Sequence, residues 1–242
     1  MNAAQIKRIP TMLKVDNVAF SKKMKLFLYG DIGTDYFDGI SLEKVENKLR
    51  YVNGIEEIEV HINSYGGDVF EAIAIMNYLK HGRNEKITTF IDGIAASGGS
   101  IIFMAGEERY MPKNSMLLVH NALTGVYGNA ADLRRAANDL DKISESVKEC
   151  YLANFIGDKE ELSELMNKDD FLKADESNAF GFATNLLDDI DLSEVTDPID
   201  NSLDIKNRLL EKYSNVKPEI KEKNNIRDNV IENFINMFKE EK

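Results

Sequence analysis

Apolar positions in this chain recur with two different periods. Residues 57–62 alternate between apolar and polar, with Ile58, Val60 and Ile62 on one side, which is typical of a strand buried on one face. Leu42, Val45 and Leu49 instead follow Ser41 at helical spacing. Along the chain these patterns predict strands at residues 25–29, 57–62, 87–91 and 116–120 and helices at residues 42–49, 69–79, 100–105 and 129–155. This alternation predicts an α/β fold with a largely parallel sheet.

The longest helical pattern, residues 129–155, has an apolar seam. Its members recur at alternating spacings of three and four, and they are Leu133, Ala136, Leu140, Ile143, Val147 and Cys150. Such a heptad-like seam fits a helix packed on its own core, and it equally fits a helix that packs against a partner subunit. Cys150 lies on this seam in the middle of the helix, which disfavours a catalytic thiol.

Composition divides the chain into three regions. Residues 1–22 are weakly patterned and are expected to form an N-terminal extension, while residues 23–190 carry the predicted elements of the main domain. Residues 191–242 form a polar C-terminal tail. Four apolar residues in that tail stand four apart and predict a short amphipathic helix, namely Ile226, Val230, Phe234 and Phe238.

Charge and cysteine content exclude several classes of protein. The 242 residues carry a net charge of -12 with a pI near 4.8, which disfavours nucleic acid as a partner. Cys150 is the only cysteine, so no internal disulfide is expected and a reducing compartment fits best. We recognise no signal peptide and no apolar run long enough for a membrane span. We therefore expect a cytoplasmic protein without a membrane partner.

Three predicted strand ends carry residues suited to catalysis. Residues 63–68 (NSYGGD) bring paired glycines to a helix start, where backbone amides can stabilise a developing oxyanion. Residues 93–100 (GIAASGGS) surround the hydroxyl of Ser97 with small side chains at a strand-to-helix junction. His120 ends an apolar strand. Because ligand sites in open α/β sheets gather at the carboxyl ends of strands, these segments are expected to converge.

Each of these features also has an ordinary structural interpretation. A Gly-Gly turn is common, Ser97 is a suitable helix N-cap, and a histidine at a strand end is more often structural than catalytic. The other histidines fit structural roles better. His61 has the opposite parity to the apolar side of its strand and faces another layer, and His81 follows a helix.

The combination of these residues favours acyl transfer. A serine needs an adjacent base to act as a nucleophile, and that base needs a third group that holds its tautomer. Asp169 or Asp170, between two predicted helices, could supply it. The chain has one cysteine, no histidine pair at ligand spacing and no P-loop, so we expect no metal and no cofactor.

The segments that carry these residues resemble the ClpP family, the proteolytic subunits of Clp proteases. HINSYGGDVFEAIAIMNYL is similar to the family's INSPGG turn and helix, and IDGIAASGGSIIFMAG is similar to its nucleophile segment. SMLLVHNA and DDFLKADESNAFGFAT resemble the histidine and aspartate segments. The four blocks occur in order over residues 26–187, which makes the match specific.

The resemblance implies a serine endopeptidase with a role for each matching residue. Ser97 would be the nucleophile, His120 the base and Asp169 the third member of the triad, with the Gly67 and Gly98 amides as the oxyanion hole. It also implies a ClpP/crotonase-like fold, a repeated β-β-α superhelix with a protruding handle helix, so that residues 23–190 would be the protease domain. The family works as a homo-oligomer of stacked rings on polypeptide substrates, without a cofactor.

The sequence also departs from the family pattern. Tyr65 replaces the proline of the turn, Gly98 replaces the methionine after the nucleophile, and residues 1–22 lack the family's Tyr- and Arg-bearing stretch. The resemblance therefore does not extend to docking of a Clp-type ATPase. These departures and the long tail look more like the ClpP-related head maturation proteases of phages and prophages, which cleave capsid or scaffold proteins.

Two other functions compete with a protease. One is a catalytically inactive shell or scaffold subunit, against which the complete Ser-His-Asp set argues. The other is a crotonase-type acyl-CoA enzyme, which shares the general fold and a Gly-rich oxyanion turn but needs neither Ser97 nor His120.

Overall fold

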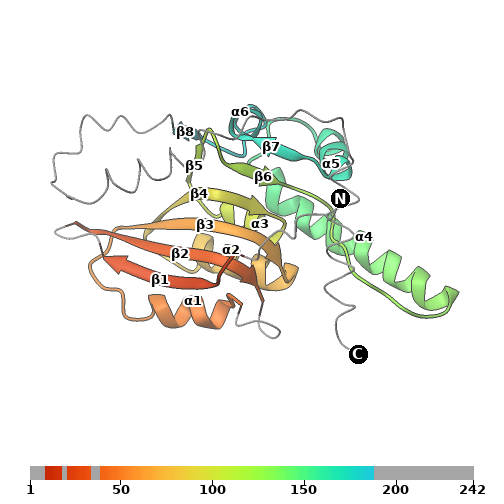
Figure 1. The fold of residues 1–242 in the computed structure, drawn as a ribbon, viewed down its shortest axis with the longest axis horizontal. Coiled ribbons are helices and arrows are strands. Elements are labelled where there is room, and N and C mark those ends of the chain that lie inside the picture. Colours follow the sequence, from red (N-terminus) through yellow and green to blue (C-terminus); the bar gives the residue numbers. More distant parts are fainter. Residues whose placement is uncertain (1–8, 18–20, 34–38, 188–242) are drawn as a thin grey trace, which may run out of the picture. The chain divides into compact units, whose positions relative to one another are not determined.

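The computed structural model describes residues 9–17, 21–33 and 39–187, which all lie in one compact unit, residues 6–189 (Figure 1). The strands are β1 Met12–Asn17, β2 Lys23–Ile32, β3 Glu57–Gly67, β4 Lys86–Ala96, β5 Glu108–Pro112, β6 Met116–Leu118, β7 Phe171–Lys173 and β8 Asn185–Leu187. The helices are α1 Leu42–Leu49, α2 Val69–His81, α3 Gly98–Phe103, α4 Ala130–Leu152, α5 Lys159–Lys168 and α6 Ala174–Ala179.

The described strands form one sheet in the order β1-β2-β3-β4-β5-β8. The pairs from β2 to β8 are parallel and β1 is an antiparallel edge strand, so the prediction of a largely parallel sheet is confirmed. β4 has two partners on one side, because its first half pairs with β5 and its last residues pair in parallel with β6. β6 in turn pairs antiparallel with β7. The end of β4 is therefore held between β3 and β6.

Side-chain caps explain where the first two helices begin. The Ser41 hydroxyl accepts from the Lys44 amide at the start of α1, and the Asp68 carboxylate accepts from the Phe70 and Glu71 amides at the start of α2. Glu71 does not complete a capping box in α2. Its carboxylate instead accepts from the Leu42 amide at 2.7 Å, which ties α1 to α2.

The central strands are longer than the apolar runs predict. The first strand was predicted to end at residue 29, before Gly30, and this is wrong. β2 continues to Ile32 through a bulge at which Gly30 takes φ +102°. β3 likewise runs to Gly67 and β4 to Ala96, through segments predicted as turns. By contrast, β6 is shorter than the predicted strand at residues 116–120. It ends at Leu118, so His120 lies just beyond it.

The two faces of the sheet differ in chemistry. The apolar side chains of β2, β3 and β4, such as Leu26, Val60 and Ile91, are completely buried in the core. On the other face, a row of stacked rings crosses four strands with centroids 4.8–5.0 Å apart, and its members are Phe27, His61, Phe90 and Tyr110. The prediction that His61 faces away from its apolar neighbours is confirmed.

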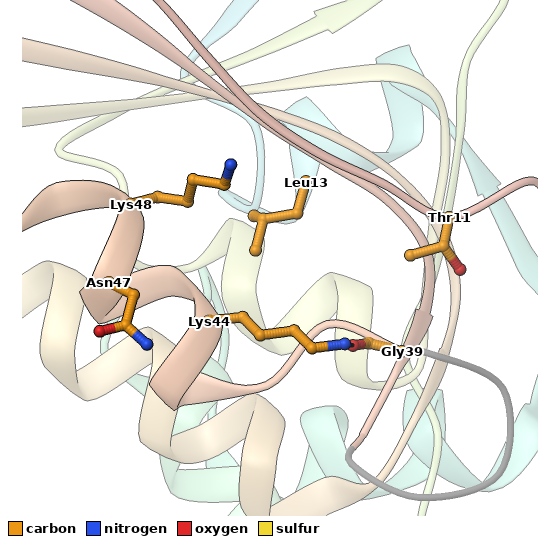
Figure 2. A pocket seen from close by; sticks show the side chains of 6 residues that line it. All are labelled: Thr11, Leu13, Gly39, Lys44, Asn47 and Lys48. Carbon is orange, nitrogen blue, oxygen red and sulfur yellow. Dashed lines mark hydrogen bonds between the residues drawn. The ribbon is translucent and has the colours of Figure 1, made fainter.

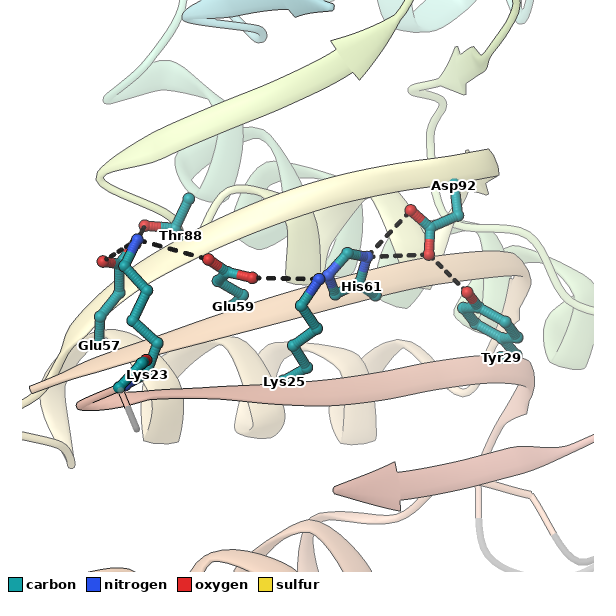
Figure 3. A network of polar contacts seen from close by, with 9 residues as sticks. Lys23, Lys25, Tyr29, Glu57, Glu59, His61, Thr88 and Asp92 are labelled. Carbon is teal, nitrogen blue, oxygen red and sulfur yellow. Dashed lines mark hydrogen bonds and ion pairs between the residues drawn. The ribbon is translucent and has the colours of Figure 1, made fainter. Parts of the chain in front are cut away.

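A polar network accompanies this ring stack (Figure 3). Asp92 accepts from the Tyr29 hydroxyl and lies 3.0 Å from His61 Nδ1. Burial, followed by the contact with Asp92, raises the pKa of the Tyr29 hydroxyl, which therefore stays protonated. Further along the face, Lys23 forms an ion pair with Glu57 at 2.8 Å. This network gives His61 a structural role away from the strand ends that carry Ser97 and His120.

Helix α4 extends away from the rest of the fold (Figure 1). Val147 and Tyr151, near its C-terminal end, are buried in the core, whereas Leu133 near its start is 48% exposed. Tyr127, in the segment that leads into α4, is also fully exposed. Among the described residues, the apolar seam of this helix therefore packs on the chain's core toward its C-terminal end.

None of the helices within the described ranges combines the length and apolar character needed to span a bilayer. The helix predicted from Ile226, Val230, Phe234 and Phe238 lies outside the described residues.

Candidate active site

The sheet brings the end of β4 beside the end of β6. Ala96, the last residue of β4, pairs with Leu118, the last residue of β6. One residue further on, the Ser97 amide donates to the Leu118 carbonyl oxygen at 3.1 Å. His120 follows Leu118 by two residues. The topology thus places Ser97 and His120 just beyond the carboxyl ends of two neighbouring parallel strands.

Ser97 has an unusual backbone conformation. It occupies the N-cap position of α3 with φ 52° and ψ -122°, and its side chain makes no capping hydrogen bond. Its hydroxyl therefore does not cap the helix, whereas the Ser41 hydroxyl caps α1 and the Asp68 carboxylate caps α2. Non-glycine residues in such sparsely populated regions cost free energy and cluster at functional sites. A strained strand-to-helix turn is also how a nucleophile elbow exposes its serine.

Glycines let the end of β3 approach Ser97 closely. A Cβ on Gly66 would lie 2.6 Å from the Ser97 Cβ and 2.8 Å from the Gly98 nitrogen, so only glycine fits there. A Cβ on Gly98 would lie 3.6 Å from the Gly67 nitrogen. The backbones at Gly67 and Gly98, the two predicted oxyanion residues, therefore run side by side next to Ser97.

Ser64 helps to hold β3 close to Ser97, although its place in the sequence did not mark it as a candidate site residue. Its buried hydroxyl donates to the Gly30 carbonyl oxygen at 2.6 Å and accepts from the Gly66 amide at 3.0 Å. It thereby fixes the backbone just before Gly67. The signal in the sequence was a serine two residues before a glycine, the spacing at which a hydroxyl bonds the backbone locally.

His120 is half-buried, and its ring is held by a neighbouring backbone group. Nδ1 lies 2.6 Å from the Asn121 carbonyl oxygen. A carbonyl oxygen can only accept, so Nδ1 carries the hydrogen and Nε2 of the neutral ring is left with its lone pair. The Asn121 side chain donates to Asn167 at 2.7 Å, which connects this segment to α5.

Asp169 lies just before the strand that pairs with β6. Leu118, the last residue of β6, pairs with Phe171, the first residue of β7, and Asp169 lies two residues before that strand. Asp169 ends α5 in the left-handed conformation, with φ 52° and ψ 41°. It is half-buried, whereas Asp170 is exposed. In the described part of the chain, Ser97 and Asp169 are the non-glycine residues with positive φ.

The three side chains are adjacent in topology but not hydrogen-bonded to one another. Among the described residues, no hydrogen bond joins His120 to Ser97 or to Asp169. In enzymes without substrate, such bonds are often long or misaligned and tighten only in the reacting complex. The arrangement therefore offers a nucleophile, a base with a free Nε2 lone pair and a carboxylate, with the imidazole turned toward Asn121.

Three other kinds of site were possible in this fold: a pocket, a reactive cysteine and a metal site. A pocket of about 320 Å³ lies between β1 and α1, lined by Thr11, Leu13, Gly39, Lys44, Asn47 and Lys48, and it contains none of the predicted site residues (Figure 2). Burial raises the pKa of the Cys150 thiol, which disfavours the reactive thiolate. Within the described ranges, no three His, Cys, Asp or Glu side chains gather in a group that could hold a metal ion.

Comparison with protein families places these elements in a known context. The model of the Clp protease family matches residues 17–189, which include β2 to β8, all the described helices and every predicted site residue. The eight-stranded sheet with its protruding α4 agrees with the ClpP/crotonase-like fold of that family. A match over most of the chain, with the predicted fold present, establishes that this protein is a member of the Clp protease family, a family of peptidases.

Proposed function

We propose that this protein is a serine endopeptidase that cleaves polypeptides through an acyl-enzyme. Ser97 is the nucleophile, His120 the general base, and Asp169 the carboxylate that stabilises the imidazolium. The amides of Gly67 and Gly98 bind the oxyanion. The observation that supports the proposal is the strand pairing: the Ser97 amide bonds Leu118, two residues before His120, and β6 pairs with β7, which begins two residues after Asp169.

Acylation follows from the character of each group. Nε2 of His120 takes the proton from the Ser97 hydroxyl as its oxygen attacks the scissile carbonyl carbon. The carbonyl oxygen becomes an oxyanion that accepts from the two glycine amides. When the intermediate collapses, the imidazolium gives its proton to the departing amine, and the acyl group remains on Ser97.

Deacylation repeats these steps with water. Nε2 removes a proton from a water molecule as the water attacks the ester carbonyl, and the proton then passes to the Ser97 oxygen, which leaves. The hydrogen on Nδ1 must stay in place during both steps. The Asn121 carbonyl oxygen already selects that tautomer, and a turn of the ring that transfers the Nδ1 hydrogen bond to Asp169 completes the triad.

The working form in this proposal is a homo-oligomer of stacked rings in the cytoplasm. Support comes from the first half of α4, where the seam residue Leu133 is 48% exposed in the described part of the chain. An apolar helix face is unfavourable in water, and it is stabilised when another protein surface covers it. A second copy of α4 from a facing ring would supply such a surface.

We further propose that the substrate is a capsid or scaffold protein of a phage. The support is in the sequence alone, namely Tyr65 in the turn, Gly98 after the nucleophile and the polar region 191–242. Cleavage of a capsid precursor in preference to an unfolded general substrate such as casein would support this role. Equal cleavage of both would favour general proteolysis.

An inactive shell or scaffold subunit is the second candidate. The observation that favours it is the His120 Nδ1 hydrogen bond to the Asn121 carbonyl oxygen, which leaves Asp169 without the imidazole. The strained backbone of Ser97, with positive φ and no capping hydrogen bond, argues against it, since a scaffold has no use for strain at this position.

A cleavage assay separates the two candidates. The assembled protein and its Ser97→Ala variant are incubated with casein and with a capsid precursor, and the products are followed by gel electrophoresis and mass spectrometry. We expect cleavage by the parent protein and none by the variant. Cleavage that survives in Ser97→Ala would refute the nucleophile, and no cleavage by either protein would favour the inactive subunit.

A further inference from the structure

A buried chain of hydroxyl groups lies under the proposed nucleophile. The Ser100 hydroxyl donates to the Ser97 carbonyl oxygen at 2.6 Å, and the Tyr151 hydroxyl lies 2.8 Å from the Ser100 oxygen. Because Ser100 has a single hydrogen and gives it to Ser97, Tyr151 must be the donor to Ser100. The chain therefore runs in one direction, from Tyr151 through Ser100 to the Ser97 carbonyl oxygen.

Both hydroxyl groups are held rigidly in the core. Ser100 in α3 and Tyr151 in α4 are completely buried. The Tyr151 ring packs edge-on against Phe182 at 6.0 Å, and the Phe182 carbonyl oxygen accepts from buried Arg109 at 2.6 Å. Burial raises the pKa of the Tyr151 hydroxyl above its usual value, so it is a donor at neutral pH.

The Ser97 carbonyl and the Gly98 amide belong to one peptide unit. In a trans peptide, the C=O and N–H bonds lie in one plane and point in opposite directions. The Ser97 oxygen accepts from the Ser100 amide at 2.9 Å, the Ile101 amide at 3.2 Å and the Ser100 hydroxyl. These donors hold the carbonyl on the helix side, so the Gly98 N–H is directed to the opposite side.

We propose that Ser100 and Tyr151 are positioning residues that orient the Gly98 amide for the oxyanion through the Ser97 carbonyl group. This inference rests on the proposed function, because it assigns a role to the same peptide unit. Neither hydroxyl touches the substrate. Their effect arises because a donor of an oxyanion hole stabilises the transition state only when it is aimed at the developing charge in advance.

Two hydroxyl deletions and their combination test the proposal. Ser100→Ala removes the last link and Tyr151→Phe removes only the first, while both keep the packed carbon atoms. We expect Ser100→Ala to lower kcat on the order of tenfold with KM unchanged, since small misplacements of catalytic groups cost up to about 10²-fold. Tyr151→Phe should have a smaller effect. The double variant should equal Ser100→Ala, because Tyr151 acts only through Ser100.

Binding of a transition-state analogue gives a second readout. A peptide boronate, which forms a tetrahedral adduct with an active serine, should bind more weakly to Ser100→Ala by the same factor as kcat falls. Thr89→Val is the matched control, since the buried Thr89 hydroxyl donates at 2.9 Å to the Phe103 carbonyl oxygen at the far end of α3. We expect this control to lower the melting temperature and leave kcat and boronate affinity unchanged.

The outcomes separate this inference from the proposed function. If the parent protein forms the boronate adduct at Ser97 but Ser100→Ala and Tyr151→Phe have parental kcat and affinity, the positioning role is refuted while the nucleophile stands. Additive losses in the double variant would also refute it. If the parent protein forms no adduct at Ser97, the proposed function itself fails.

Discussion

The Ser97 amide donates to the Leu118 carbonyl oxygen at 3.1 Å, which joins the end of β4 to the strand that leads to His120. This bond continues the parallel ladder by one residue beyond the pairing of Ala96 with Leu118. The sheet therefore fixes the backbone at Ser97, while His120 lies in the segment just beyond the end of β6.

Replacement of Asp169 tests the third member of the proposed triad. Asparagine tolerates the left-handed conformation well, so Asp169→Asn should fold normally. Without the carboxylate, the imidazolium loses its counter-charge, and kcat should fall on the order of 10³- to 10⁴-fold. Asp170→Asn, one residue away and exposed, is the matched control and should keep nearly full activity. Peptidase assays on both variants decide between the two aspartates, and an equal loss in both would contradict the assignment.

Replacement of Gly66 tests the close approach of β3 to Ser97. In Gly66→Ala the new Cβ would lie 2.6 Å from the Ser97 Cβ, at φ +99°. We expect a loss of about 2–4 kcal/mol in the free energy of unfolding, from overpacking and backbone strain together, and a loss of activity. Gly54→Ala is the control, because its φ is also positive but no atom lies within 4 Å of the added Cβ. It should cost about 1 kcal/mol and leave activity intact. Urea unfolding and peptidase assays provide both measurements.

An ion pair at the end of α2 should make stability depend on pH. Burial is the largest single influence and raises the pKa of Glu85, but hydrogen bonds from Arg83 and from backbone amides, together with the Arg83 charge, outweigh it, so the pKa lies below its usual value of 4.5. A carboxyl group with a lowered pKa contributes stability that is present above its unfolded pKa and is lost as pH falls through the folded one. Glu85→Gln should therefore be less stable than the parent protein at pH 7, and this difference should disappear as pH falls below 4.5. Urea unfolding across that range measures it, with exposed Glu107→Gln as control. A constant difference at all pH values would contradict the prediction.

Assembly through α4 can be tested at Leu133. This exposed seam residue lies where a facing subunit would cover it, so Leu133→Asp would bury an unpaired charge in the contact. We expect smaller species in sedimentation velocity, with unchanged circular dichroism. Asn138→Asp adds the same charge at an exposed position outside the seam and should assemble normally. Identical sedimentation of Leu133→Asp and the parent protein would show that α4 does not mediate assembly.

The apolar periodicity predicted the central strands and the larger helices well. Ile58, Val60 and Ile62 are buried as their alternation predicts, and α1 begins at Leu42 after the Ser41 cap. The short strands β5, β7 and β8 escaped prediction because three to five residues are too few to show a period. β1 escaped because an edge strand that is half-exposed on both faces does not alternate clearly.

The site was only partly accessible from sequence. Small residues around Ser97 and the strand end before His120 are visible in the order of amino acids, and Asp169 could be preferred to Asp170 only by resemblance. The antiparallel pairing of β6 with β7, the strands next to His120 and Asp169 in sequence, is a long-range contact that no local pattern encodes. The buried pair of Ser100 and Tyr151 joins residues 51 positions apart, and it also had no local signal.

The most direct test of a nucleophilic Ser97 is covalent labelling of the assembled protein. A fluorophosphonate probe is added to the parent protein and to Ser97→Ala and His120→Ala variants, and the modified peptide is located by mass spectrometry. We predict a single phosphonylated residue, Ser97, with no label in Ser97→Ala and strongly slowed labelling in His120→Ala. Labelling of another residue, or an assembled parent protein that stays unlabelled, would contradict the account.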